Sequence, residues 1–164
     1  MMTKIKPAQQ GAAQRQLNSW RSQIKFARDT YAINELITKF NYLDFATVLE
    51  ESQRDWHQEQ QERFIESILL AYPQNPLYFA LNKKELIVVD GFQRIKTLVE
   101  FINNKLVLAQ GLTKMTTFKG FTFNDFTLKQ RQHFLETSFP VVIFKELPEN
   151  LKIDFAKRLN QITA

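Results

Sequence analysis

The chain contains no cysteine. This absence excludes disulfides, thiolate nucleophiles and cysteine metal sites, and it is typical of a reducing compartment. Two histidines, His57 and His133, are too few for a histidine-rich metal centre. No apolar run approaches the roughly 20 residues that span a bilayer, and the first residues lack a signal-peptide core. We therefore expect a soluble cytoplasmic protein with no membrane partner.

Glycine is also scarce, with only Gly11, Gly91, Gly111 and Gly120 in the chain. None is followed by Lys-Ser/Thr at the spacing of a Walker-type phosphate loop, and the dinucleotide-binding fingerprint is missing as well. A Gly-x-Ser-x-Gly elbow, which would carry a serine nucleophile, is absent. The sequence therefore excludes the common glycine-rich nucleotide loops and the common nucleophilic hydrolases.

The residues that are present favour one domain with a phenylalanine-rich core. The chain has 164 residues, 44% of them hydrophobic, and 15 are phenylalanine. Short apolar runs alternate with segments of helical periodicity, so the predicted class is α+β. We expect helices over 17–31, 33–40, 64–69, 95–102, 128–136 and 148–159, and strands over 77–80, 86–89 and 140–144, the first two strands as a hairpin. A further short strand is expected within 42–49, and residues 116–126 could form a small hairpin or an ordered loop.

The most informative stretch is LIVVDGFQRIKTLVEF, residues 86–101. A buried strand stops at Asp90-Gly91, and a helix with one apolar stripe follows. The N–H groups of the first helical turn and the helix dipole favour an anion at such a junction, and Arg94 offers a planar fork of donors. From this stretch alone an ordinary structural explanation is favoured, in which Asp90 caps the helix and Arg94 pairs with a surface acid.

Positive charge is concentrated near the N-terminus. Residues 1–35 hold six cations against Asp29 and Glu35, which gives +4 of the net charge of +5. A polyanion such as DNA should meet this basic amphipathic helix first. The alternatives are a helix packed on the domain and a helix for self-association. The DNA-binding candidates are Arg15, Arg21, Lys25 and Arg28.

A second polar cluster, Gln53-Arg54-Asp55-Trp56, precedes the helix at 64–69. Arg54 could place another cation on the phosphates that Arg94 binds, with Gln53 as a polar contact. Asp90 could also hold a metal ion together with Asp55, Glu59 or Glu62 and support nuclease chemistry.

Taken together, the two clusters resemble a known family, the ParB-like N-terminal domain of GmrSD-type modification-dependent restriction proteins. Its Gln-Arg-x-aromatic element corresponds to residues 53–56, and its Asp-Gly-Gln-Gln-Arg-Leu-x-Thr-Leu motif corresponds to residues 90–98, with Phe92 in place of the first glutamine. The helix pattern at 64–69, the proline-containing turn and strand at 73–79, and Arg158-Leu159-Asn160 match in the same order. The resemblance covers about residues 45–160.

The charge and the helical periodicity near the N-terminus predict a basic helical arm over 1–40. The resemblance implies that residues 41–164 form a ParB-like domain with a ParB/sulfiredoxin-like α+β fold, a small mixed sheet flanked by helices. It also implies a site that binds a nucleoside triphosphate with Mg²⁺ and hydrolyses it to control DNA cleavage. By position, Asp90 and Arg94 would be catalytic and Asp90 would hold the metal. The nucleotide would contact Gln53, Arg54, Gly91, Gln93, Arg94, Thr97, Arg158 and Asn160.

The family's His-Asn-His nuclease domain does not follow Asn160. Either the chain stops short of the nuclease domain, or the ParB-like domain acts as a stand-alone sensor. A nuclease domain or subunit is a further expected partner, and an oligomer is a further alternative. Three functions are therefore open: an NTP-binding regulatory domain of a DNA-defence or phage protein, a non-catalytic DNA-binding module, and a metal-dependent nuclease.

Overall fold

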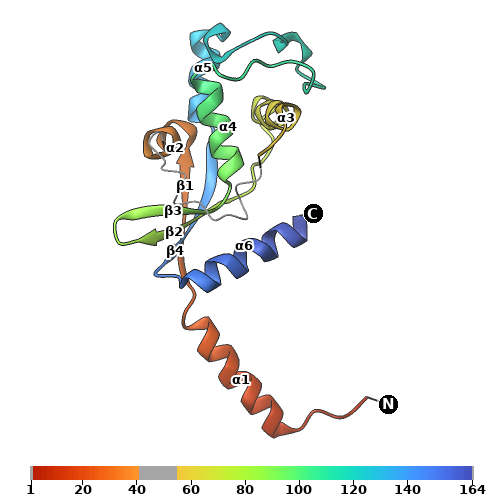
Figure 1. The fold of residues 1–164 in the computed structure, drawn as a ribbon, viewed down its shortest axis with the longest axis vertical. Helices are drawn as coiled ribbons and strands as arrows, with labels where there is room; N and C mark the ends of the chain where they lie inside the picture. Colours follow the sequence, from red (N-terminus) through yellow and green to blue (C-terminus); the bar gives the residue numbers. More distant parts are fainter. Residues whose placement is uncertain (1, 41–54, 164) are drawn as a thin grey trace.

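The computed structural model describes residues 2–40 and 55–163, and it contains one mixed sheet with helices on both of its faces (Figure 1). This confirms the predicted α+β class. The elements in chain order are α1 (Pro7–Arg21), β1 (Lys25–Ala32), α2 (Ile33–Phe40), α3 (Gln58–Leu69), β2 (Leu77–Asn82), β3 (Glu85–Asp90), α4 (Phe92–Ile102), the short 3-10 helices η3 (Thr116–Phe118) and η4 (Phe123–Asp125), α5 (Leu128–Glu136), β4 (Ser138–Lys145) and α6 (Glu149–Thr163).

The four strands lie in the order β1-β4-β2-β3. β2 and β3 form the predicted antiparallel hairpin, β4 runs parallel to β2, and β1 pairs antiparallel with β4 over its whole length. β4 is therefore a central strand, and β1 and β3 are the edges. Among the described residues, no helix combines the length and the apolar character that crossing a bilayer requires.

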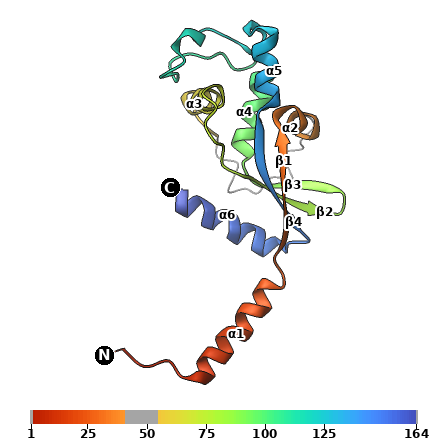
Figure 2. The ribbon, with the colours of Figure 1, turned by 180° about the vertical axis from the view of Figure 1, so that it is seen from behind.

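Alternate residues of β2, β3 and β4 face two separate cores, as the period of two requires. Val88 belongs to the larger core, which α2, α3, α4 and α5 cover, whereas Val89 belongs to the smaller core beneath α6. In β4, Val141 and Phe144 divide in the same way. The two views of the ribbon show α6 on one side of the sheet and α2, α3, α4 and α5 on the other (Figures 1 and 2).

One expected helix is wrong in its extent. The helix predicted over 17–31 ends at Arg21, and residues 25–32 form β1. The spacing of Leu17, Ile24 and Tyr31 fits a helix. Without β1, however, one side of β4 would have no strand to pair with, and this pairing takes precedence over the local helical pattern.

The helices over 33–40, 128–136 and 149–163 are confirmed, the second with Thr127 Oγ1 accepting from the Gln130 N–H at 3.1 Å. The strand expected within 42–49 lies outside the described residues.

Residues 103–127 form an ordered loop rather than a hairpin, and its phenylalanines close the larger core. The ring of Phe101 makes edge contacts with Phe123, Phe126 and Phe134 at centroid distances of 5.4 to 5.7 Å. Such pairs add about 0.5–1.5 kcal/mol each beyond their buried area. The expected phenylalanine-rich core is therefore present, and much of it comes from this loop.

Two buried carboxylates on α3 accept hydrogen bonds from backbone N–H groups of the same loop. Glu62 accepts from the Gly111 N–H at 2.5 Å. Glu66, which is 4% exposed, accepts from the N–H groups of Thr113, Lys114 and Met115 at 2.9 Å and from the Thr113 hydroxyl at 3.1 Å. Burial raises the pKa of Glu66, but these hydrogen bonds together outweigh burial and hold the pKa below its usual value.

Glu66→Gln is expected to lower the free energy of unfolding by about 1–3 kcal/mol at pH 7, because an amide cannot accept all of these donors and carries no charge. The folded-state pKa of Glu66 is depressed. Its stabilising contribution is therefore present above the unfolded pKa and is lost as the pH falls through the folded value. Urea unfolding of both proteins from pH 7 to pH 3 measures this, and the two curves should converge at low pH.

Glu59→Gln is the matched control, because Glu59 lies on the same helix with its side chain 63% exposed and pairs with Arg63 at the surface. A surface pair of this kind contributes about 0–1 kcal/mol. Equal losses in the two variants would contradict the role assigned to Glu66.

Candidate functional site

The junction between β3 and α4 requires a glycine. Gly91 has φ +113°, a left-handed conformation that side chains resist. A Cβ there would lie 2.5 Å from Leu77 Cδ2 and 3.3 Å from Arg94 Nη2. The strand-turn-helix arrangement predicted from residues 86–101 is confirmed, and the backbone at Gly91 packs directly on its neighbours.

Asp90 does not cap α4, contrary to the structural explanation considered from sequence. Gly91 is the N-cap residue, with no side-chain cap, and its carbonyl accepts from the Ile95 N–H at 3.1 Å. The Asp90 carboxylate instead pairs with Arg94 Nη2 at 3.4 Å. Its acidic oxygen is therefore directed along the outside of the first helical turn rather than onto the N–H groups of that turn.

Arg94 connects the turn before β2 to the start of α4 through hydrogen bonds. Its guanidinium donates to the carbonyl oxygens of Asn75 at 2.6 Å and Pro76 at 2.8 Å, in addition to Asp90. The side chain is 14% exposed. Arg94 therefore binds protein acceptors on several sides, and its main effect in this structure is to position the 75–76 turn.

Burial affects the titration of both members of this pair. It raises the pKa of Asp90, and the positive charge of Arg94 opposes this rise only in part. Burial likewise lowers the pKa of Arg94. A buried acid whose pKa is raised, at the edge of a cleft, is a candidate for proton transfer or ligand binding.

A cleft of about 1090 Å³ opens at this junction. Its walls come from the segment before α3 and α3 itself, the turn between α3 and β2, the start of α4 and the end of α6. The lining residues are Asp55, Trp56, His57, Gln60, Phe64, Ser67, Tyr72, Pro73, Gln74, Asn75, Pro76, Tyr78, Asp90, Gly91, Phe92, Gln93, Arg94, Leu159 and Asn160. Five of these are aromatic, so the cleft combines apolar ring faces with the polar start of a helix.

Gln93 ties α4 to the segment before α3. It is 8% exposed, and its side-chain oxygen accepts from the Trp56 N–H at 3.2 Å. Its amide nitrogen lies 3.5 Å from an oxygen of Asp55, which also pairs with Lys96 at 2.8 Å. The hydrogen bond from Lys96, followed by the charge of Lys96, holds the pKa of Asp55 below its usual value.

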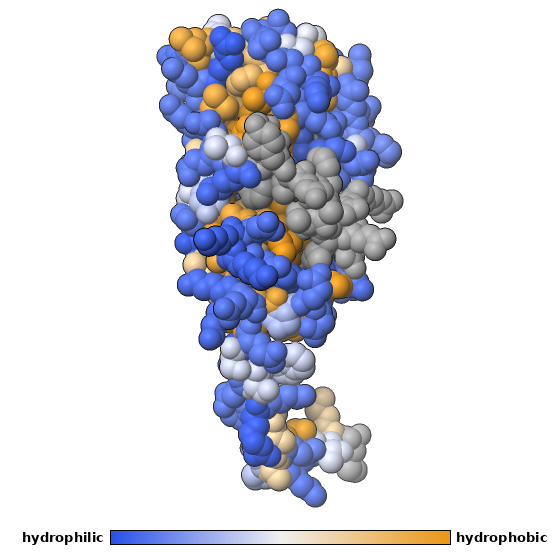
Figure 3. Space-filling model, turned by 60° about the vertical axis from the view of Figure 1, so that its left-hand side comes forward, coloured by the Kyte–Doolittle hydropathy of each residue, from blue (hydrophilic) through white to orange (hydrophobic). Residues whose placement is uncertain are grey.

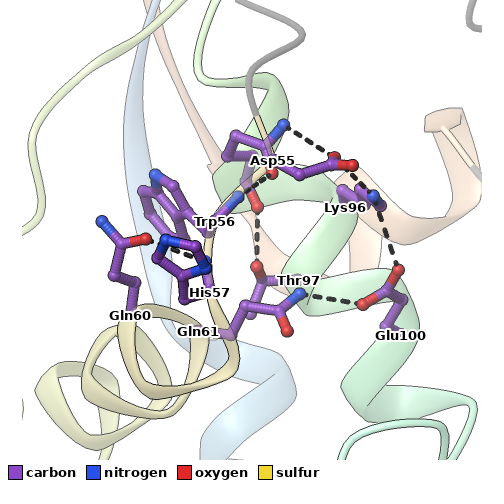
Figure 4. A network of polar contacts seen from close by, with 9 residues as sticks. Asp55, Trp56, His57, Gln60, Gln61, Lys96, Thr97 and Glu100 are labelled. Atoms are coloured by element: carbon purple, nitrogen blue, oxygen red, sulfur yellow. Dashed lines mark hydrogen bonds and ion pairs between the residues drawn. The ribbon is translucent and has the colours of Figure 1, made fainter.

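The network continues along α4, away from the cleft (Figure 4). Lys96 lies 4.0 Å from Glu100, which in turn accepts from the side chain of Gln61 at 2.9 Å. Thr97 is fully buried and donates to the Gln93 carbonyl at 2.7 Å. These contacts join α3 and α4 behind the cleft and keep the Gln93 backbone in place.

The structure brings most of the predicted site residues together. Asp90, Gly91, Gln93, Arg94 and Asn160 all line the cleft. The other candidates differ in position: Thr97 is buried behind Gln93, Arg158 is exposed and pairs with Asp154 at 2.8 Å, and Gln53 and Arg54 lie outside the described residues.

Three further residues line the cleft that were not predicted from the sequence, Tyr72, Tyr78 and His57. Tyr72 immediately precedes the predicted turn at Pro73, and this position is the feature of the sequence that could have indicated it as a cleft residue. Within residues 2–40 and 55–163, no group of three or more His, Cys, Asp or Glu side chains is placed to hold a metal ion. Asp55, Glu59 and Glu62, the acids considered as partners of Asp90, are engaged with Lys96, Arg63 and the Gly111 N–H respectively.

The fold and the cleft define a small α+β domain whose polar site lies at a strand-glycine-helix junction. The family model for the GmrSD restriction endonuclease N-terminal domain matches residues 33–163, and the chain belongs to this family. Membership associates the chain with restriction, that is, with DNA defence. Neither the curated proteins nor the solved structures compared with the chain gave a match.

Gly91→Ala is expected to lower the free energy of unfolding by about 2–4 kcal/mol, because it combines left-handed strain with an overlap on Leu77. Chemical denaturation measures the loss. Gly120→Ala is the matched control, since Gly120 also has positive φ, +88°, but has no atom within 4 Å of a new Cβ. It should cost about 1 kcal/mol, and an equal cost at both positions would show that the close approach to Leu77 is unimportant.

Asp90→Asn is expected to leave the free energy of unfolding unchanged at pH 7, or to raise it by up to about 1 kcal/mol, because burial disfavours the charged carboxylate. The raised folded-state pKa means that the contribution of Asp90 to stability is fully present below its unfolded pKa and is lost as the pH rises through the folded value. Unfolding of both proteins between pH 3 and pH 7 measures the difference, which should change over this range.

Asp154→Asn provides the comparison, because Asp154 is an exposed acid that pairs with Arg158. The difference between this variant and the native protein should stay small over the same pH range. A large loss of stability in Asp90→Asn at pH 7 would show that the Asp90–Arg94 ion pair outweighs the cost of burial.

Proposed function

We propose that the chain is a nucleotide-binding regulatory domain of a DNA-restriction system, and that its cleft takes a nucleoside triphosphate with Mg²⁺. The observation that carries the proposal is the position of the Gly91 junction, which lies in the wall of the cleft together with the first turn of α4. The family supports the biological setting, DNA defence.

The start of α4 would hold phosphate oxygens. N–H groups in the first turn of a helix have no helical carbonyl to pair with, and the positive end of the helix dipole lies beside them. Gly91 has no side chain to screen this end, and Asp90 is turned toward Arg94 rather than capping it. The dipole of α4 would therefore favour an anion at this point.

The aromatic side chains would receive the base. Trp56 packs edge-on against Phe64 at a centroid distance of 5.6 Å, which fixes its ring beside the cleft. Tyr72 lines the same cleft and is 57% exposed. A volume of about 1090 Å³ suits a ligand larger than a phosphate ion.

Asp90 is the residue that would hold Mg²⁺, since its carboxylate lies in the cleft wall with its side chain 25% exposed. Sites for Mg²⁺ commonly use one or two carboxylates and complete the coordination with substrate phosphates and water, so a single acid is compatible with this donor set. When bound, the ion neutralises charge on the phosphate oxygens. Arg94 serves this site by positioning the 75–76 turn, so Arg94→Ala would disturb the cleft wall as well as remove a cation.

A triphosphate with Mg²⁺ is expected to raise the melting temperature, because a ligand that binds only the folded state stabilises it by mass action. At a concentration of about 100 times Kd the gain is about 2.7 kcal/mol, or roughly 5–10 °C for a domain of this size. Thermal denaturation with each of the four common triphosphates measures the shift. Tyr72→Ala should raise Kd about tenfold through lost stacking.

Asn160→Ala and Asn150→Ala are a matched pair on α6. Both residues are exposed, but only Asn160 lines the cleft. The first substitution should reduce the shift and the second should leave it unchanged. The absence of a shift with all four triphosphates would contradict the proposal, and an equal effect of the two asparagine variants would contradict this location for the site.

A further inference from the structure

The N-terminal segment is strongly and uniformly basic. Residues 1–28 contain six cations, namely Lys4, Lys6, Arg15, Arg21, Lys25 and Arg28, and no acidic residue. All six side chains are exposed. This segment, apart from its last few residues in β1, also lies outside the sheet, and all of residues 1–32 lie outside the part of the chain that the family model matches. Its function therefore cannot be taken from the family.

α1 does not pack on the domain. The helix has no buried residue, and both ribbon views show it extending away from the body (Figures 1 and 2). The space-filling view shows a mainly hydrophilic arm and apolar surface on the body (Figure 3). The first alternative from sequence, a helix packed on the domain with a solvated basic side, is therefore wrong.

One face of α1 carries hydrogen-bonding side chains. Gln10, Gln14, Asn18 and Arg21 follow one another at spacings of four, four and three residues, so they form one stripe. Gln14 donates to Asn18 at 3.0 Å, and Arg15 flanks the stripe. Amide and guanidinium groups of this kind pair with the base edges of adenine and guanine. Leu17 lies on the same side, between Gln14 and Arg21, whereas Gln9, Gln16 and Ser19 lie on the opposite side.

The basic surface continues onto the end of the sheet next to α1. Lys25 of β1 lies directly opposite Lys145 of β4, and Lys145 is also in register with Leu81, next to the β2–β3 turn that contains Lys83 and Lys84. Like charges directly opposite on neighbouring strands are destabilising. We call Lys25, Lys83, Lys84 and Lys145 the sheet-end lysines. Two acids, Glu85 and Glu146, lie at the same end, so the four lysines and two acids together have a net charge of +2.

We infer that α1 and the sheet-end lysines form one binding surface for duplex DNA, with α1 in the major groove and the lysines on the flanking phosphates. The major groove of B-form DNA admits an α-helix, whereas the deep, narrow major groove of A-form RNA does not. Phosphates opposite Lys25 and Lys145 would also relieve their mutual repulsion. The surface lies apart from the nucleotide cleft and does not depend on it.

The test is fluorescence anisotropy with a labelled duplex of about two helical turns, titrated at several salt concentrations without nucleotide. Affinity should fall steeply with salt, with a slope of about 0.9 per phosphate contact. Deletion of residues 2–21, which leaves β1 whole, and the double variant Lys25→Gln/Lys145→Gln should each weaken binding about tenfold or more. Circular dichroism and urea unfolding of these variants confirm that they are folded.

Lys105→Gln/Lys119→Gln is the matched control. It also removes two exposed lysines, but from the 103–127 loop, which lies at the opposite end of the molecule from α1 (Figure 1). Its affinity should stay within twofold of the native value. Gln14→Ala/Asn18→Ala should reduce discrimination among sequences selected from a random duplex pool and leave the salt slope unchanged, which separates reading of the bases from charge.

Several results would overturn the inference. Salt-independent binding, undiminished binding after deletion of residues 2–21, or equal losses in the control variant would each do so. Equal affinity for single-stranded DNA or for an RNA duplex would remove the assignment to the major groove of DNA. Absence of DNA binding, together with a dimer in sedimentation that the deletion converts to a monomer, would show that α1 docks on a second copy of the chain.

Discussion

The guanidinium of Arg94 connects the parts on which the cleft depends. Its donors engage the carbonyls of Asn75 and Pro76 just before β2 and the carboxylate of Asp90 at the end of β3. One side chain thus joins the entry to one strand of the hairpin, the exit from the other and the first turn of α4. Because Gly91 has no Cβ, Leu77 can pack against this junction, and the three segments form one wall. The shape of the cleft therefore follows from a few contacts around one glycine and one arginine.

Much of this architecture was predictable from local sequence. The strands at 77–80 and 86–89 are short apolar runs, the helix after Asp90-Gly91 has helical periodicity, and all three elements are present. The segment 25–32 was not predictable in this way, because its strand conformation depends on β4, which lies more than a hundred residues later. The residue pattern within 25–32 holds no information about the strand β4, with which this segment pairs.

Residue roles were harder to predict than elements. Arg94 has the side chain expected of a phosphate ligand, yet its contacts are with carbonyls that only the folded turn presents. Glu62 and Glu66 share one stripe of α3 with Ile65, and this was a readable sign of buried carboxylates, although their partners at 111–115 could not be identified from sequence. Phe92, which replaces a glutamine of the family motif, is 5% exposed and contributes to the larger core, so this exchange strengthens packing at the cleft wall.

The pairing of β1 along the whole of β4 also has a mechanical consequence. The arm enters the domain at Lys25, at one end of this ladder, and the two strands run antiparallel over eight residue pairs. A pull on α1 along the direction of β1 would load all of these hydrogen bonds at once, instead of opening them one after another from an end. β4 is itself flanked by β2, so the load would spread into the centre of the sheet. Force applied to the arm would therefore reach the body of the domain without peeling its edge strand away.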